Sequence, residues 1–357
     1  MTTSPKGITE KEIRDALEQH HAPAPSGTPS TTPAPEDLED LVAEIVESVE
    51  SAAGGGSAEE HTGTETPASE AAPAPAPAPA PAPSVPAPAP SPTETAPAAP
   101  APAPAPAPPA PSSGTKRVVY GDLTVTEAGT VVDSVDVHGA IIVKAPNVTI
   151  SNSIVRGPDS ANSFTLINAL AGHPGLKVVD TELVASFPNY YVNGIMGYNF
   201  ELRRVNIHGV IDQVHLTGGN VTIADSWLHD NLHFSPDPNH ADNKSHDDNI
   251  QIQAGDNITI VNNTFSGSHN AVVMITQGMG KVSNVRFERN KVDNGGCAVN
   301  IAENAYGALS GISLIDNTFG LTTKFARCAL VIKSPGTTPL LQGNVFTDGK
   351  SISITRH

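Results

Sequence analysis

The stretch NITIVNNTF at residues 257–265 decides the fold, because close copies of it recur along the second half of the chain. It returns as NVRFERNKV at residues 284–292 and as GISLIDNTF at 311–319, a spacing of 27 residues each time (284 − 257 and 311 − 284). Further copies continue the register at 340–346 and, with looser spacing, begin at Asn147, Gly175, Asn199 and Asn220. Each copy alternates apolar and polar residues, reaches Asn or Asp and continues into a second short strand. Short strands at this period, with no helical stretch between them, predict a solenoid of stacked β-coils.

The repeat resembles the right-handed parallel β-helices of the pectate-lyase-like superfamily, over about residues 118–357. The resemblance implies an all-β, right-handed, single-stranded parallel β-helix with three strands per coil around a stacked aliphatic core. Four asparagines fit the ladder that such helices place at a tight turn, namely Asn263, Asn290, Asn317 and Asn344. In that position their amides hydrogen-bond to the coils on either side, so we expect a structural role for them.

The composition of the chain changes at Lys116. Of the 33 prolines, 25 precede this residue, and residues 1–115 contain 16 acidic and three basic side chains, a local charge of 3 − 16 = −13 out of the total −17. Such a segment cannot bury a core, and an Ala-Pro repeat favours an extended spacer. We therefore predict an acidic, mostly disordered arm at 1–70 with short helices near 9–20 and 36–50, a Pro/Ala-rich linker at 71–115, and the β-helix domain at 116–357. The two short helices are either weakly ordered stretches of the arm or docking peptides.

Bulk composition excludes several classes of partner. The acidic arm repels phosphates, so we expect no nucleic-acid partner. The longest apolar runs are far below the roughly 20 residues that span a bilayer, so we expect no membrane insertion. The first residues contain no apolar signal core, and we expect no Sec-type export signal.

The two cysteines, Cys297 and Cys328, fall on successive coils. A strand spacing of about 4.8 Å permits a disulfide, but we favour two reduced, stacked core thiols.

Histidines gather where the repeat is interrupted. Seven of the 13 histidines lie between His208 and His269, and the longest departure from the period falls in the same window (257 − 220 = 37). The additional residues are 231–245. In a solenoid, an insertion maps to a loop beside one face and often marks the binding face. This window is therefore the best candidate for a site.

Two strands beside the insertion align residue by residue, 212–217 with 248–253. The alignment places Asp212 and Asp248 at equivalent strand starts, one coil apart. A carboxylate pair with further acids and histidines nearby supports acid–base chemistry or binding of a cation. The outward-facing positions beside the pair, and the polar residues near it, are His215, Gln251, Gln253, Asn300, His246 and Asp230.

A closer resemblance is to glycoside hydrolases of the polygalacturonase type. That family has an Asp on one coil, Asp-Asp at the next strand start and Gly-His-Gly on the coil after. Asp212, Asp247-Asp248 and Ser268-His269-Asn270 match these elements in order. The family's Arg-Ile-Lys pair, which grips a substrate carboxylate, is replaced by Asn300-Ile301-Ala302, and the two glycines are absent. These departures argue against a pectic substrate and against carrying hydrolysis over directly.

The resulting site hypothesis assigns two groups of residues. The catalytic group is Asp212, Asp247, Asp248 and His269. The substrate-binding group is His215, Gln251, Gln253, Asn300, His246 and Asp230. No metal ligand and no cofactor are assigned, with a divalent cation as the alternative. Three aromatic side chains are candidates for stacking on sugar rings, namely Trp227, Tyr190 and Tyr191. The competing interpretation is that these acids only cap turns by bonding local amides.

Three functions fit this layout. The first is a phage tailspike-like or minor tail protein of the virion, attached through its N-terminal arm, facing a surface polysaccharide and forming a homotrimer. The second is a bacterial extracellular polysaccharide lyase, glycoside hydrolase or epimerase. The third is a non-catalytic structural or adhesive β-solenoid. We favour the first, with hydrolase or lyase activity as an open question.

Overall fold

The structure is a computed structural model that describes residues 116–160, 163–303, 306–333 and 336–356. The arm expected at 1–70, its short helices and the linker expected at 71–115 lie outside these residues. The described part contains strands and turns, and none of it is helical. Accordingly, no helix within these ranges has the length and apolar character needed to cross a membrane.

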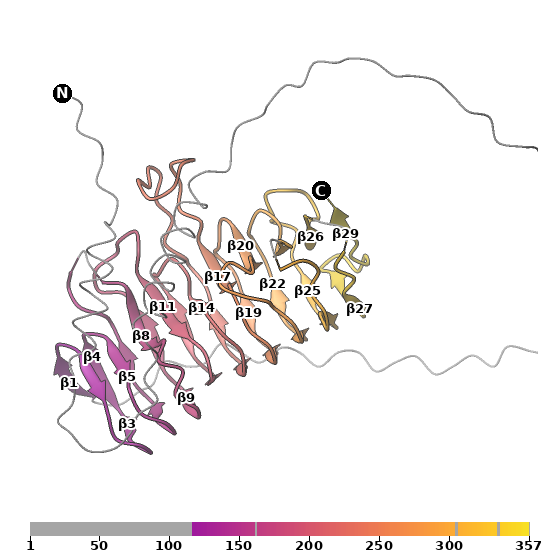
Figure 1. Cartoon of the computed structure of the whole chain (residues 1–357). Helices are drawn as coiled ribbons and strands as arrows, with labels where there is room; N and C mark the ends of the chain where they lie inside the picture. Colours follow the sequence, from indigo (N-terminus) through magenta and orange to yellow (C-terminus); the bar gives the residue numbers. More distant parts are fainter. Residues whose placement is uncertain (1–115, 161–162, 304–305, 334–335, 357) are drawn as a thin grey trace, which may run out of the picture. The chain divides into compact units, whose positions relative to one another are not determined.

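The described chain winds through three parallel sheets of ten, ten and nine strands, which we name sheets A, B and C. Successive strands enter A, then B, then C, and each strand pairs in parallel with its counterpart one coil away, as between β17 (Asp248–Ile252) and β20 (Ala271–Ile275). Figure 1 shows the coils stacked from β1 (Arg117–Tyr120) to β29 (Ile354–Arg356). The predicted parallel β-helix is confirmed.

The strands are short because each coil turns three times. Sheet A consists of β1, β4 (Val135–His138), β7 (Ile154–Val155), β10 (Glu182–Val184), β13 (Asn206–His208), β16 (Trp227–Leu228), β19 (Thr264–Phe265), β22 (Lys291–Val292), β25 (Thr318–Phe319) and β28 (Val345–Phe346). Sheet B consists of β2 (Leu123–Val125), β5 (Ile141–Val143), β8 (Thr165–Ala169), β11 (Asn193–Gly197), β14 (Val214–Leu216), β17, β20, β23 (Val299–Ile301), β26 (Leu330–Ile332) and β29. Sheet C consists of β3 (Val131–Asp133), β6 (Thr149–Ser151), β9 (Leu176–Val179), β12 (Phe200–Arg203), β15 (Val221–Ala224), β18 (Ile258–Val261), β21 (Val285–Glu288), β24 (Ser313–Ile315) and β27 (Leu340–Gln342).

The core lies inside the coils and follows the alternation in the sequence. In β18, Ile258 and Ile260 are fully buried, whereas Thr259 between them is only partly buried. Ile258 pairs with Val285 one coil away, which is the 27-residue offset of the repeat. Ile258 also pairs with Val221 in the other direction, an offset of 37 residues that absorbs the insertion. The hydrophobic period therefore fixes the register, because a slip by one residue would expose every inward side chain.

The asparagine ladder is present as expected. Asn290 is buried, and its Nδ2 donates to the carbonyl oxygen of Ile260 at 3.0 Å and to Asn317 Oδ1 at 3.1 Å. Its own Oδ1 accepts from the backbone nitrogen of Asn263 at 2.9 Å. The same pattern repeats from Asn317 to Asn344. Ser226 caps the ladder on the preceding coil, where its backbone nitrogen donates to Asn263 Oδ1.

A second turn explains why the copies before the last one begin with Asn or Gly. The first residue of these copies has a left-handed backbone, with φ of +59° at Asn257, +50° at Asn284 and +69° at Gly311. Gly and, among residues with a side chain, Asn tolerate this region best. The asparagines also stack, because Asn257 Nδ2 donates to Asn220 Oδ1 at 3.1 Å.

The prediction of two free core thiols is wrong. Cys297 and Cys328 form a disulfide between successive coils, with their Cα atoms 4.7 Å apart. Both sulfur-bearing side chains are buried with Val331 in a small cluster separate from the main core. Ala298 and Val299 both belong to the main core, so the alternation breaks at the start of β23. Counting back from Val299 therefore gave the wrong face for Cys297.

Removing this disulfide should lower stability. The bond closes a loop of 31 residues, for which the chain-entropy model gives about 3–4 kcal/mol of stabilisation. We expect a Cys297→Ser, Cys328→Ser double variant to lose about that free energy of unfolding, measured by chemical denaturation. Wild-type protein denatured in the presence of a reductant is the control and should lose the same amount. Coincident curves for the oxidised wild type and the double variant would show that the bond does not stabilise the chain.

Candidate functional site

The candidate site lies where three successive connections from sheet A enter the strands of sheet B. These connections precede β14, β17 and β20 and comprise residues 209–213, 229–247 and 266–270. The middle connection contains the insertion at 231–245. Figure 1 shows this loop projecting beyond the coil next to β17. The strand starts therefore bring together residues that are 22 to 36 positions apart in the sequence.

Asp212 and Asp248 occupy the same position on neighbouring coils, as predicted. Val214 pairs with Ile250. Asp212 and Asp248 each lie two residues before these partners, so they face each other across the two coils. The backbone nitrogen of Asp248 donates to Asp212 Oδ1 at 3.0 Å, and that of Asp212 donates to Asn193 Oδ1 at 3.0 Å. One oxygen of Asp212 is thus part of a side-chain ladder that caps the next coil. Its other oxygen, Oδ2, lies 3.1 Å from His215 Nδ1.

Asp248 is a buried carboxyl between its two acidic neighbours in the site. It is 1% exposed, and Asn270 Nδ2 donates to its Oδ1 at 3.0 Å. Burial raises the pKa of Asp248 well above its usual range, and the neighbouring charges of Asp212 and Asp247 raise it further. The Asn270 hydrogen bond opposes this rise in pKa. Asp248 is therefore held where its charged form is costly.

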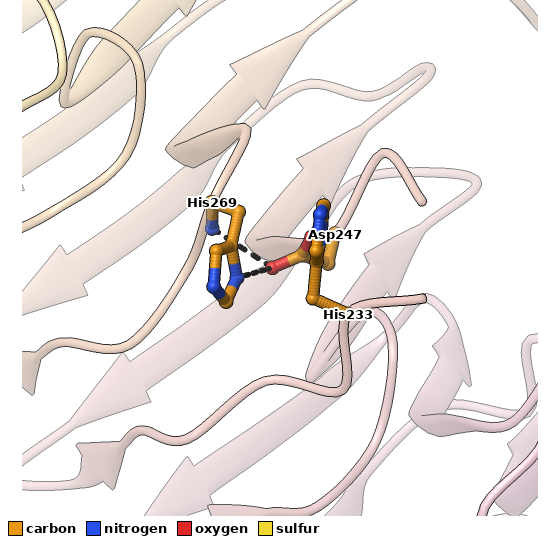
Figure 2. A group of neighbouring side chains, drawn as sticks. All are labelled: His233, Asp247 and His269. Atoms are coloured by element: carbon orange, nitrogen blue, oxygen red, sulfur yellow. Dashed lines mark hydrogen bonds and ion pairs between the residues drawn. The ribbon is translucent and has the colours of Figure 1, made fainter. Parts of the chain in front are cut away.

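Asp247 lies between two histidines. His233 Nδ1 lies 2.7 Å from Asp247 Oδ1, and His269 Nδ1 lies 3.0 Å from Asp247 Oδ2. The backbone nitrogen of His269 also donates to Oδ2, at 2.8 Å. Figure 2 shows the two rings on either side of the carboxylate, and their centroids are 4.1 Å apart. Burial raises the pKa of Asp247, and the hydrogen bonds from both histidines oppose that rise.

His233 was not predicted from the sequence, although it contacts the same carboxylate as His269. It lies in the insertion, where the repeat supplies no register from which to infer a position. The concentration of histidines around the interrupted coil was the only signal that pointed to it. The side chain of His233 is 25% exposed and that of His269 is 53% exposed, whereas Asp247 is fully buried. The two histidines therefore present the surface of the site and the carboxylate lies behind them.

The outward column of sheet B is only partly as predicted. His215 pairs with Gln251, and Gln251 pairs with Met274, which in turn pairs with Asn300. Met274 was not foreseen in this column and separates Gln251 from Asn300. Gln253 lies two residues further along and is partly buried. His215 is 9% exposed, so its ring is largely covered.

A buried network of hydrogen-bonded amide side chains lies next to the residues that carry the carboxyls. Asn249 Nδ2 donates to Gln213 Oε1 at 2.6 Å and to Asn231 Oδ1 at 2.9 Å. Asn231 Nδ2 donates in turn to the carbonyl oxygens of Ile211 and Asp248. All three amide side chains are buried. Such a connected network restricts the backbone that carries Asp247 and Asp248.

The insertion is held by hydrogen bonds within itself and by contacts with the connection that precedes β11, two coils away. Asp237 is fully buried and accepts from Ser245 Oγ at 2.7 Å and from the backbone nitrogen of Asn239 at 3.0 Å. The ring of Tyr190 lies 4.6 Å from that of Phe234, and Tyr191 donates its hydroxyl to Asn239 Oδ1 at 2.8 Å. The loop is thus an ordered part of the site.

Two further predicted residues lie in other contacts. Asp230 has a 79% exposed side chain and its partner is His229, whose ring stacks on Trp227 at 3.5 Å between centroids. This group belongs to the end of the sheet A strand, and Trp227 is covered by His229 on one side. His246 stacks on His240 at 4.1 Å within the insertion and pairs with Asp242. The structure therefore brings Asp212, Asp247, Asp248, His215 and His269 together, and joins neither Asp230 nor His246 to them by a hydrogen bond.

The carboxyls of the site have histidine and amide partners. Within the described residues, the carboxyls of Asp212, Asp247 and Asp248 are hydrogen-bonded or ion-paired to histidines, an asparagine and backbone amides, with no Lys or Arg among these partners. Imidazole groups next to buried carboxyls can donate and accept protons or coordinate a cation.

Substituting Asp248 tests whether it is a structural residue. An Asp248→Asn change keeps the shape and removes a buried charge beside two others, so we expect a gain of about 1–3 kcal/mol in the free energy of unfolding at pH 7. Because the folded-state pKa of Asp248 is raised, this gain should shrink as the pH falls from neutral toward about 4, and it should vanish below that pH, where the carboxyl is protonated in both states.

Thermal melts at both pH values measure this effect. Asp237→Asn is the matched control, since Asp237 is equally buried but fully hydrogen-bonded, and this variant should lose stability. A loss of stability in Asp248→Asn at pH 7 would contradict the prediction.

Fold and site together define a single-stranded parallel β-helix with a polar, histidine-bearing centre at the edge of sheet B. No family model matches the sequence, and no curated protein matches it. Among solved structures, the chain is similar to the A-module of the Azotobacter vinelandii mannuronan C-5 epimerase AlgE6, with 12% identity, a TM-score of 0.45, and coverage of 65% of this chain and 61% of that one. It is also similar to the Dettilon tailspike protein, with 14% identity, a TM-score of 0.26, and coverage of 69% and 62%. The chain thus spans less than two thirds of either structure.

Proposed function

We propose that this chain is a polysaccharide-recognising β-helix protein that contacts glycan through the edge of sheet B at β14, β17 and β20. Of the face predicted from the sequence, His269, Gln251 and Asn300 are accessible, whereas Asp212, His215, Asp247 and Asp248 lie buried beneath them. The observation that carries the proposal is the interrupted coil. Its insertion adds His233 to the predicted residues and packs against two tyrosines that remain 37% exposed, Tyr190 and Tyr191. Exposed aromatic rings beside hydrogen-bonding groups are suited to sugar rings, which have apolar faces and polar edges.

The finer role we propose is that of a phage tailspike-like or minor tail protein acting on a host surface glycan. The acidic segment and Ala-Pro repeat of residues 1–115 support it, because they suit an attachment arm and a spacer. The disulfide between Cys297 and Cys328 is in keeping with a virion or extracellular setting, where disulfides persist. A homotrimer belongs to the same proposal, and light scattering of the full chain would then give three times 36.8 kDa.

A reaction at this site would use His269 as the group nearest the substrate. Its ring is exposed and oriented by the buried Asp247, an arrangement that favours proton transfer in hydrolysis or elimination. The burial of Asp247 and Asp248 favours a second candidate, a glycan-binding or adhesive solenoid without catalysis. In that case the carboxyls only shape the coil, and the histidines and tyrosines supply the contacts.

Purified surface polysaccharides provide the test. The full chain is incubated with a panel of bacterial capsules and lipopolysaccharide O-chains, and both co-sedimentation and release of reducing ends are measured. We expect saturable binding to at least one neutral polysaccharide in the panel. New reducing ends would establish the enzyme, and binding without them the adhesin. Failure to bind any member of the panel would contradict the proposal.

A further inference from the structure

The group formed by His233, Asp247 and His269 has the composition of a metal site. Two imidazole nitrogens and one carboxylate oxygen from these residues lie within 4.8 Å of one another. Within the described residues, no other group of three His, Cys, Asp or Glu side chains brings its potential ligand atoms within that distance. Figure 2 shows that the three residues come from separate segments and converge on one point.

The nitrogen and oxygen atoms of the group lie slightly closer together than the ligands of a bound transition-metal ion. Zinc lies about 2.0–2.2 Å from nitrogen and carboxylate ligands, so two ligands in a tetrahedral shell are about 3.4 Å apart. Here the two nitrogen-to-oxygen distances are 2.7 Å and 3.0 Å. An ion between the three groups needs only a small outward shift of the rings, which are partly exposed and able to move. A mixed set of imidazole and carboxylate ligands favours zinc, cobalt or nickel over calcium or magnesium.

The charge around the group also favours a cation. Asp247 is fully buried and directly precedes the buried Asp248, whose backbone nitrogen is hydrogen-bonded to the third carboxyl, Asp212. The described contacts of these three carboxyls include no Lys or Arg to balance them. A divalent ion would supply that balance, and solvent could complete its shell on the side where His269 is exposed.

We propose that His233, Asp247 and His269 bind one divalent transition-metal ion of the zinc class. The site joins the insertion to two consecutive coils, so the ion would fasten the loop to the β-helix. It would also place a positive charge at the glycan-facing edge. This inference goes beyond the proposed function, because binding of the ion can be measured without any glycan.

Equilibrium dialysis of the full chain, prepared without a polyhistidine tag, against Zn²⁺ tests the proposal. We expect one high-affinity ion per chain and a melting temperature that rises with zinc concentration. His233→Ala and His269→Ala should each weaken binding at least tenfold. Substitution by Co²⁺ should give the visible absorption of a tetrahedral complex with nitrogen ligands.

The matched control is His246→Ala, which removes a histidine of the same loop that stacks on His240 and pairs with Asp242. Its zinc affinity should equal that of the wild type. If either alanine variant melts early without zinc, the corresponding His→Gln variant, which keeps a donor toward Asp247, supplies the comparison. The proposal is overturned if no ion binds, if both histidine variants bind as tightly as the wild type, or if His246→Ala abolishes binding. None of these results bears on glycan binding.

Discussion

If the proposed site cleaves glycan, His269→Ala is expected to lower turnover by about 10²–10⁴-fold, the range that a positioned acid or base contributes. The reason is that His269 is the exposed member of the cluster, and its Nδ1 lies 3.0 Å from the buried Asp247. Asp247→Asn should lower turnover in the same assay. The carboxylate can accept a hydrogen bond from each histidine ring, whereas the amide of Asn has only one acceptor oxygen and cannot orient both rings in this way. Rates of reducing-end release at saturating substrate measure both effects.

The matched control for this experiment is His173→Ala. His173 lies in the turn between β8 and β9, at the opposite ends of the sheet B strands from the site. Its substitution should leave turnover unchanged. If His269→Ala and Asp247→Asn also turn over glycan at the wild-type rate, the reaction does not occur at this edge of the β-helix.

The largest effect on stability is expected for Asn290→Ala. This side chain connects three coils, and its loss leaves the carbonyl oxygen of Ile260 and the backbone nitrogen of Asn263 without their partner. Each buried polar group left unpaired costs about 1–3 kcal/mol, so we expect the free energy of unfolding to fall by about 3–5 kcal/mol. Chemical denaturation followed by circular dichroism measures the loss.

Lys291→Ala is the neighbouring control for the ladder. Lys291 is exposed on the outer face of β22, so its substitution should change stability by no more than about 0.5 kcal/mol. Equal denaturation midpoints for Asn290→Ala and Lys291→Ala would show that the ladder adds nothing to stability.

Most of the fold could be predicted because a β-helix repeats its constraints in every coil. Ile258 and Val285 are aligned by the same 27-residue offset in the sequence and in the sheet. The left-handed turn at Asn257 and the ladder at Asn263 recur at that offset for physical reasons. The turn needs a residue that adopts a positive φ, and the ladder needs a buried side-chain amide that hydrogen-bonds to the next coil. The pairing of Asp212 with Asp248 followed from the same alignment.

The errors fall where the repeat gives no register. His233 was missed because the insertion has no counterpart in other coils. Cys297 was assigned to the main core by counting back from Val299, but Ala298 and Val299 both face that core. Asp230 was assigned to the acidic centre, although it follows the sheet A strand and pairs with His229 instead. Local bends at strand ends decide such positions, and alternation alone does not report them.

A crystal of the full chain soaked with an oligosaccharide from the polysaccharide that binds it most tightly tests the central claim directly. The account predicts that the sugar lies along the edge of sheet B at β14, β17 and β20, in contact with His269 and close to Tyr190 and Tyr191. A sugar bound on the outer face of sheet C, with His269 and both tyrosines free of it, would contradict the account.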